Sequence, residues 1–150
     1  MIHTLMPTEN NTYLSIFGHK KEVTKVLIIG NNPLELADIY DKLGNSRRKY
    51  YIVDVSFNLK DGRRRALKNV PDVILLDDNL DYREMKIFAD EIKGQNKFSH
   101  LKIILMKSSN QKYVLLEQVE DYLLKHAIST EMLDKVITNQ MSTKVHHMAD

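Results

Sequence analysis

A short aliphatic run that ends in two carboxylates constrains the fold of this chain more than any other feature. Residues 71–80 read Pro-Asp-Val-Ile-Leu-Leu-Asp-Asp-Asn-Leu, so the apolar run stops at Asp77. A continuous run of this length is typical of a strand buried on both faces, as in a parallel sheet covered by helices. Ligands of such sheets bind where the strands end at their carboxyl edge. Asp77 is therefore a candidate functional residue, and the simpler alternative is an edge carboxylate that stays solvated.

Four more segments have the composition of strands, and helical patterns lie between them. The strands that we expect are 25–29, 50–55, 73–77, 101–106 and 119–124. The apolar stripes expected on helices are Leu34, Ile39, Tyr40 and Leu43; Ala66, Leu67 and Val70; Met85, Ile87, Phe88, Ala89 and Ile92; and Ile128, Met132, Leu133, Val136 and Ile137. The segment 108–118 is short for a crossover helix. Because parallel neighbours need crossover connections, the sequence predicts an α/β fold, with a doubly wound five-stranded parallel sheet in a three-layer α/β/α sandwich.

The two ends of the chain read differently from its middle. A length of 150 residues fits one domain, which we place at 23–141. Residues 1–22 are expected to form a partly flexible N-terminal extension with a short strand at 13–17. Residues 142–150 are expected to be a frayed tail.

Composition narrows the classes of function. The absence of cysteine excludes disulfides, thiolate catalysis and zinc sites with cysteine ligands. The net charge is only +2, and no aromatic residues accompany the basic run 63–65, so we expect a solvated helix face and no nucleic-acid partner. No apolar run approaches the roughly 18 residues that span a bilayer, and the first residues are unlike a signal peptide. We therefore expect a cytoplasmic protein with no membrane partner.

Polar side chains follow four of the expected strands. These are Gly30-Asn31-Asn32, Asp77-Asp78-Asn79, Lys107-Ser108-Ser109 and Lys125-His126. Because the carboxyl ends of parallel strands meet at one edge of a sheet, we expect these groups to form one site. It would contain a central carboxylate, one or two ammonium groups, and several amide or hydroxyl dipoles. No glycine-rich phosphate loop and no nucleophile elbow is present.

Residues 24–141 resemble the receiver domain of bacterial two-component response regulators, which has a flavodoxin-like topology. The resemblance rests on 71–77, on Asp121-Tyr122-Leu123-Leu124-Lys125, and on 25–29 followed by Asn32-Pro33. It implies that a sensor histidine kinase or a phosphotransfer protein phosphorylates Asp77 and that Lys125 pairs with the phosphoryl oxygens. These roles make chemical sense, because a carboxylate is a nucleophile and an ammonium group offsets the added charge. The resemblance also implies a switch role for Tyr122, for which the simpler alternative is an aromatic residue that covers core.

The first departure from the family pattern concerns magnesium. Receivers end their first strand with an acidic pair that holds Mg²⁺, and the corresponding residues here are Gly30 and Asn31. The metal ligands left are Asp77, Asn31 and the backbone carbonyl of Asn79, with Asp78 as a spare acid. Because Mg²⁺ favours carboxylate oxygens in a small octahedral shell, we expect Mg²⁺ to bind weakly.

Further departures affect the rest of the expected pocket. Lys107 stands where receivers have serine or threonine, and Ser108 follows one residue later. In unmodified register Lys107 would enter the pocket and form an ion pair with Asp77. Three other family positions are also changed: Asp81 replaces a proline, Met85 replaces a glycine, and His126 replaces the proline after the conserved lysine.

The leading hypothesis is a stand-alone receiver-like module in phosphorelay signal transduction, not an enzyme. Its output would act through a downstream protein partner or a homodimer formed by the fourth helix, fifth strand and last helix. The alternative is a pseudo-receiver that docks or dimerises without phosphorylation. A third hypothesis, from a different class, is a small flavin or nucleotide binder, since the same crevice serves such ligands.

Overall fold

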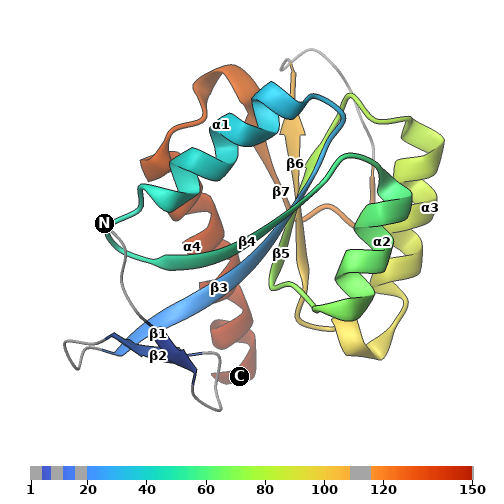
Figure 1. The fold of residues 1–150 in the computed structure, drawn as a ribbon. Coiled ribbons are helices and arrows are strands. Elements are labelled where there is room, and N and C mark those ends of the chain that lie inside the picture. The colour runs from blue at the N-terminus through green and yellow to red at the C-terminus, as the bar shows by residue number, and fades with distance from the viewer. Residues whose placement is uncertain (1–4, 8–11, 16–19, 109–115, 150) are drawn as a thin grey trace.

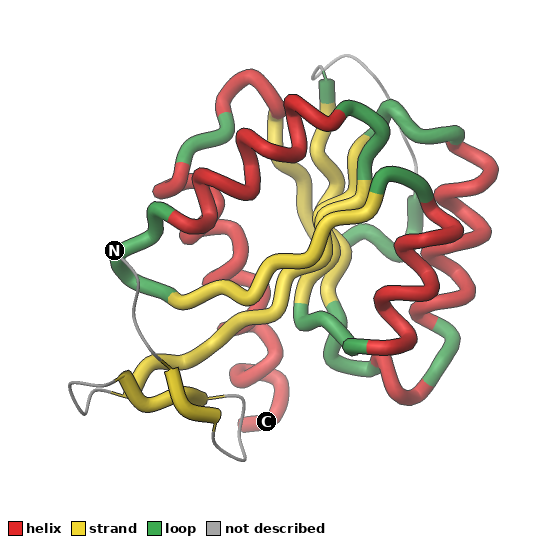
Figure 2. Tube along the Cα trace, viewed as in Figure 1, coloured by secondary structure: helices red, strands yellow, loops and turns green. Residues whose placement is uncertain are grey.

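A central sheet with helices on both faces forms the body of the molecule (Figures 1 and 2). The computed structural model describes residues 5–7, 12–15, 20–108 and 116–149, with side chains from residue 23 to residue 142 within these ranges. The strands are β1 (Leu5–Pro7), β2 (Thr12–Ser15), β3 (Lys20–Ile29), β4 (Tyr50–Ser56), β5 (Val73–Asp77), β6 (Lys102–Lys107) and β7 (Asp121–Leu124). The α-helices are α1 (Pro33–Gly44), α2 (Leu59–Lys68), α3 (Tyr82–Lys93) and α4 (Thr130–Ala149), and short 3₁₀ turns span Asn96–Phe98 and Lys125–Ala127.

The parallel part of the sheet has the strand order β4-β3-β5-β6-β7. This is the flavodoxin-like order, so the prediction of a doubly wound five-stranded parallel sheet is confirmed. Two antiparallel strands are added to it, because β2 pairs with the first residues of β3 and β1 pairs with β2. The boundary expected between residues 22 and 23 therefore falls inside β3, which begins earlier than the sequence indicated.

The two faces of the sheet are buried by different helices, as Figure 1 shows with α1 and α4 on one side and α2 and α3 on the other. Alternate residues of each strand face opposite layers, so Val26 and Ile28 join one core cluster and Leu27 and Ile29 the other. The four core residues of β5, Val73–Leu76, are fully buried. The aliphatic run that ends at Asp77 is thus the centre of both layers.

The helices bury fewer of their apolar residues than the sequence indicated. Helix α1 buries Leu36, Ile39 and Leu43, whereas Leu34 is 84% exposed and Tyr40 is also exposed. Leu34 is two residues before Leu36, about 200° around the helix, so the two side chains cannot both face the sheet. Ile87 in α3 and Met132 in α4 are likewise exposed and were assigned wrongly to the core stripes.

Several expected boundaries also change. Strand β7 begins at Asp121 rather than at residue 119, and α4 continues to Ala149 across the residues for which we expected a tail. The expected strand at 13–17 corresponds to β2, and its last two residues lie outside the described ranges. Most of the segment 108–118 also lies outside them. In the described ranges, no helix has the length and apolar character needed to cross a bilayer.

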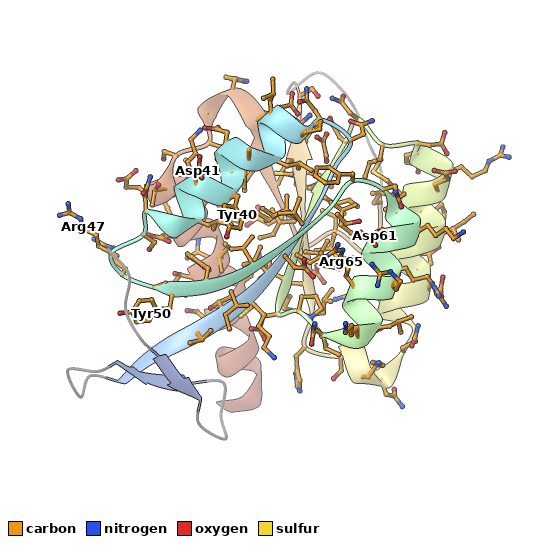
Figure 3. The ribbon with its side chains drawn as sticks, viewed as in Figure 1. Tyr40, Asp41, Arg47, Tyr50, Asp61 and Arg65 are labelled. Carbon is orange, nitrogen blue, oxygen red and sulfur yellow. The ribbon has the colours of Figure 1, made fainter. Side chains whose placement is uncertain are left out.

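The basic run of α2 forms ion pairs on the surface. Arg65 contacts Asp61, one turn earlier on the same helix (Figure 3), and Asp54 on β4, while Arg64 contacts Asp61. Hydrogen bonds from these two guanidinium groups, together with the Ser56 hydroxyl, hold the pKa of Asp61 well below its usual range. Arg65 connects α2 to the edge strand β4, and Arg64 forms an ion pair within α2, which supports a structural use for the run.

Candidate functional site

The carboxyl ends of the parallel strands lie at one edge of the sheet, at the top of Figure 1. Ile29 pairs with Leu76 in the sheet register, and Asp77 pairs with Met106. The residues that follow β3, β5, β6 and β7 are therefore neighbours, as the sequence indicated.

Asp77 is the buried centre of this edge, with 1% of its side chain exposed. Its Oδ1 lies 2.6 Å from Lys125 Nζ and accepts a hydrogen bond of 2.8 Å from the backbone N–H of Asn79. Its Oδ2 is buried and has no hydrogen-bond partner among the described residues. The structure thus brings the two residues with the strongest sequence support, Asp77 and Lys125, into direct contact.

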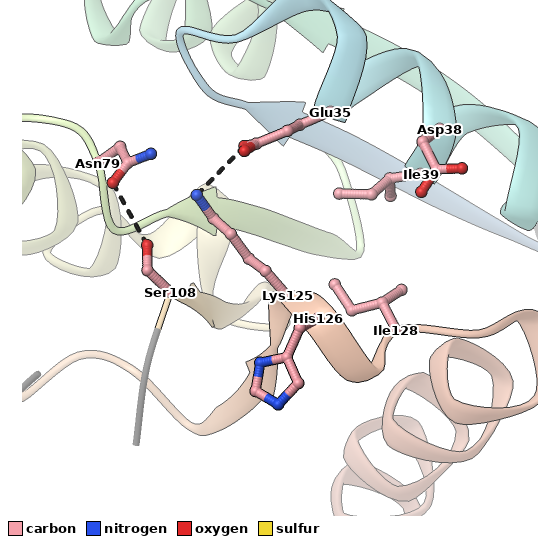
Figure 4. A pocket seen from close by; sticks show the side chains of 8 residues that line it. All are labelled: Glu35, Asp38, Ile39, Asn79, Ser108, Lys125, His126 and Ile128. Carbon is pink, nitrogen blue, oxygen red and sulfur yellow. Dashed lines mark hydrogen bonds and ion pairs between the residues drawn. The ribbon is translucent and has the colours of Figure 1, made fainter. Parts of the chain in front are cut away.

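Lys125 is surrounded by three carboxylates. In addition to Asp77, its Nζ lies 3.2 Å from Glu35 Oε2, as Figure 4 shows, and 3.9 Å from Asp78 Oδ1. Burial alone would lower the pKa of Lys125, but the hydrogen bonds and charges of Asp77 and Glu35 outweigh burial and raise this pKa. Lys125 is therefore a firmly protonated cation at neutral pH.

Asp78 connects the loops after β5 and β6. Its Oδ1 accepts a 2.7 Å hydrogen bond from the Ser108 hydroxyl, and its Oδ2 accepts a 2.9 Å bond from the Ser108 backbone N–H. The same hydroxyl lies 3.3 Å from Asn79 Oδ1. Asp78, which we expected to be a spare acid, is thus buried and holds Ser108 at the site.

Lys107 does not pair with Asp77, as its position in the strand had suggested, but contacts Tyr122. Its Nζ lies 5.2 Å from the centre of the Tyr122 ring, within the range of a cation–π contact. The cation beside Asp77 is instead Lys125. The ring of Tyr122 is exposed, so the alternative in which Tyr122 covers core does not apply.

The residues at this edge do not fit a magnesium shell. A Cβ atom at Gly30 would lie 2.9 Å from Leu36 Cδ2 and 3.1 Å from Asp77 Oδ2, so Leu36 and Asp77 fill the space of the family's first acid. Asn31 is exposed on the turn before α1. Within the described ranges, no three histidine, aspartate or glutamate side chains are grouped to hold a metal ion.

A pocket of about 360 Å³ opens beside Lys125 (Figure 4). It is lined by Glu35, Asp38, Ile39, Asn79, Ser108, Lys125, His126 and Ile128. Of the four residues that we expected in the pocket, Ser108 lines it, whereas Asn31, Asp78 and Lys107 do not. A small polar group that enters here meets the ammonium group of Lys125 and the hydroxyl of Ser108.

Glu35 is the site residue that sequence reasoning missed. The pattern Asn32-x-x-Glu35 before an apolar stripe is the signature of a capping box, in which the glutamate side chain turns back to the helix start. Asn32 does cap α1, because its side chain accepts hydrogen bonds from the backbone N–H groups of Leu34 and Glu35. The Glu35 carboxylate instead reaches across to Lys125.

Two family departures have local structural explanations. Asp81 is the N-cap of α3, where its carboxylate accepts a 3.0 Å hydrogen bond from the backbone N–H of Glu84. Met85 is buried on the inner face of the same helix. Both residues therefore stabilise α3 where the family uses proline and glycine.

Comparison with known proteins gives a match in structure but not in sequence. No protein-family model matches the chain, and no curated protein matches it significantly. A response regulator receiver modulated diguanylate cyclase from Pelobacter carbinolicus is 21% identical, with a TM-score of 0.66 over 85% of this chain and 99% of that chain. The receiver domain of a sensor histidine kinase from Pseudomonas aeruginosa, solved with a magnesium ion coordinated in its active site cleft, is 20% identical, with a TM-score of 0.62 over 79% and 98%. A Vibrio cholerae CheY-type chemotaxis protein is 19% identical, with a TM-score of 0.63 over 78% and 98%. The chain therefore has the fold of response regulator receiver domains.

Proposed function

We propose that this chain is a receiver-like module of phosphorelay signal transduction in which Asp77 accepts a phosphoryl group. The observation that supports this most is the contact between Asp77 and Lys125, which places a nucleophilic carboxylate 2.6 Å from a cation at the carboxyl edge of the sheet. The donor would be a phosphohistidine on a sensor kinase or phosphotransfer protein. We place the protein in the cytoplasm, where such donors work, and assign it no enzymatic activity of its own.

The transfer uses few groups of this chain. A carboxylate oxygen of Asp77 forms a bond to phosphorus as the phosphorus–nitrogen bond of the donor histidine breaks, and the histidine keeps the electron pair. The product at Asp77 carries about two negative charges near pH 7, so Lys125 moves from the carboxylate to the phosphoryl oxygens. Ser108, held by Asp78, can donate its hydroxyl to the same oxygens.

The output of the module would be protein contact. The exposed ring of Tyr122 on β7 contacts Lys107, the half-buried last residue of β6. We propose that a change at Ser108 moves Lys107, the residue before it, and alters the surface that a partner or a second copy reads.

The alternative is a pseudo-receiver that never carries phosphate. It is favoured by one specific observation, which is that Gly30 and Asn31 leave no magnesium shell beside Asp77. In that case the standing ion pair between Asp77 and Lys125 holds one constant surface, and the protein serves as a docking or dimerisation module.

Phosphorylation by a small-molecule donor separates the two. The purified protein would be incubated with acetyl phosphate and Mg²⁺, and its intact mass and its migration on a phosphate-affinity gel would be followed. We expect one added phosphoryl group, absent in Asp77→Asn and retained in the matched control Asp78→Asn. A wild-type protein that stays unmodified would reject the first proposal in favour of the pseudo-receiver.

A further inference from the structure

Lys125 has an exposed carboxylate partner in addition to its two buried ones. The side chains of Asp77 and Asp78 are 1% and 0% exposed, whereas that of Glu35 is 41% exposed. Glu35 and Lys125 both line the pocket, and Figure 4 shows the ion pair that joins them. Glu35 thus belongs to the part of the pocket that an incoming ligand meets, and Asp77 does not line that pocket.

The position of Glu35 is fixed by the start of α1. Pro33 occupies the first turn of the helix, and the Asn32 side chain accepts a 3.3 Å hydrogen bond from the Glu35 backbone N–H. This cap anchors the backbone from which the Glu35 side chain extends to Lys125. The ion pair therefore connects the first turn of α1 to the residue that follows β7, across the mouth of the pocket.

The charges around the pocket oppose the entry of an anion. Glu35 and Asp38 line it, and Lys125 already lies within 4 Å of the carboxylates of Glu35, Asp77 and Asp78. A phosphoryl group would add about two more negative charges within a few ångströms. Lys125 cannot pair fully with such a group while it also holds Glu35.

We propose that Glu35 is a latch that holds Lys125 over Asp77 and limits the access of anions to the site. The inference rests on the proposed function for its biological meaning, because the anion concerned is a phosphoryl group or its analogue. Glu35 acts through Lys125 and is a positioning residue. Phosphorylation of Asp77 then requires that the contact between Glu35 and Lys125 open.

The first test measures the hold on Lys125 and does not depend on phosphorylation. Wild type, Glu35→Gln and Asp38→Asn would be treated briefly with a small amine-acylating reagent, and the extent of acylation at Lys125 would be read by peptide mass spectrometry. Asp38 is the matched control, since it lines the same pocket and loses the same charge but pairs with Lys42. We expect faster acylation of Lys125 in Glu35→Gln alone. Equal rates in all three proteins would reject the latch.

The second test measures anion access. Beryllofluoride with excess Mg²⁺ would be titrated into the same three proteins while amide shifts near Asp77 are followed by NMR. Since an exposed ion pair is worth up to about 1 kcal/mol, we expect Glu35→Gln to bind beryllofluoride up to about fivefold more tightly than wild type, and Asp38→Asn to change binding less.

The two tests fail in different ways. Faster acylation with unchanged beryllofluoride binding would overturn anion exclusion, and weaker binding in Glu35→Gln would show that Glu35 is a ligand for the cation instead. If no protein binds beryllofluoride, anion exclusion is overturned as well, while the hold on Lys125 is judged by acylation alone. The proposed function is judged separately, by the modification of wild type and Asp77→Asn with acetyl phosphate.

Discussion

Asp77 and Lys125 are a buried charge pair, and such a pair affects stability mainly when one member is removed. A lone buried charge keeps its desolvation cost without the attraction that offset it. The Oδ2 atom of Asp77 is buried and has no hydrogen-bond partner among the described residues. The ion pair with Lys125 is therefore a main source of stabilisation for the buried Asp77 carboxylate.

The pair therefore predicts a strong coupling between two substitutions. Lys125→Met should lower the free energy of unfolding by about 3 kcal/mol, because it leaves the Asp77 carboxylate buried beside an apolar side chain. Adding Asp77→Asn should restore a large part of that loss, and urea denaturation of the four proteins in the cycle would measure the coupling. Equal losses in the single Lys125→Met protein and the double variant would contradict this account of the pair.

Restoring the acidic pair of the family at residues 30 and 31 should increase the affinity for Mg²⁺. Replacing Gly30 and Asn31 together by aspartate should tighten Mg²⁺ binding about tenfold or more, since two carboxylates then join Asp77. The same change should cost stability, because the new Cβ at residue 30 meets Leu36 Cδ2 at 2.9 Å. Amide shifts during a Mg²⁺ titration would measure the affinity.

A matched control for that change lies one residue further on. Asn32→Asp adds a carboxylate to the same turn and still caps α1, so it should leave Mg²⁺ affinity nearly unchanged. Tight Mg²⁺ binding by the wild-type protein would show that Gly30 and Asn31 matter less than we infer.

The sequence indicated some of the side chains at the site correctly, but it placed Asn31 and Lys107 in the pocket wrongly and missed Glu35. Asp77, Ser108 and Lys125 follow strand ends, and strand ends share an edge in any parallel sheet. Contacts depend on side-chain direction and on neighbours distant in sequence, so the pairing of Asp78 with Ser108 and of Glu35 with Lys125 could not be read from spacing.

At the scale of elements, a buried carboxylate joins the last helix to the sheet edge. Asp134 of α4 is buried and accepts hydrogen bonds from the Tyr51 hydroxyl of β4, at 2.6 Å, and from the Ser46 hydroxyl after α1, at 2.8 Å. Burial, followed by the hydrogen bond and the charge of Asp134, raises the pKa of Tyr51 well above its usual value. Tyr51 therefore stays protonated in the folded protein over the usual pH range.

This network predicts a stability difference that depends on pH. Tyr51→Phe should lower the free energy of unfolding at neutral pH by about 1–2 kcal/mol, because Asp134 loses one of its donors. Above about pH 10 the unfolded wild-type chain releases the Tyr51 proton while the folded one keeps it, so wild type loses stability as pH rises. The difference in the free energy of unfolding between wild type and Tyr51→Phe should then become smaller. Urea denaturation at neutral and alkaline pH would test this, and a constant difference would contradict the raised pKa.

The ends of a helix could be predicted from the sequence where a capping residue or a glycine marks them. Asn32 and Gly44 delimit α1 closely, and Gly94 ends α3. The buried faces were less predictable, because Leu34 and Ile87 are as apolar as the residues that pack. Hydrophobicity reports what can be buried, and the position of the helix on the sheet decides what is buried.

At the scale of the molecule, the sheet topology was predictable because the pattern repeats five times. Each aliphatic run without alternation requires helices on both faces, and right-handed crossovers then leave few possible strand orders. The antiparallel addition of β1 and β2 was not predicted as a pair, since short strands of three and four residues give little periodic signal.

The topology predicts where the molecule is most resistant to local opening. Strand β5 has strand neighbours on both sides and is fully buried, whereas β4 has β3 as its one strand neighbour in the described part of the chain. Amide hydrogen exchange should therefore be slowest in Val73–Leu76 and faster in the amides of β4 that point away from β3. Exchange in β4 as slow as in β5 would indicate that a partner or second copy covers this edge.

The central claim is that Asp77, and not the adjacent Asp78, carries the phosphoryl group. Borohydride reduces an aspartyl phosphate to homoserine, so fragmentation of the peptide that contains both residues locates the modified position. After treatment of the wild-type protein with acetyl phosphate and Mg²⁺, we predict homoserine at position 77 and unchanged aspartate at position 78. Homoserine at position 78, or at neither position, would contradict the account.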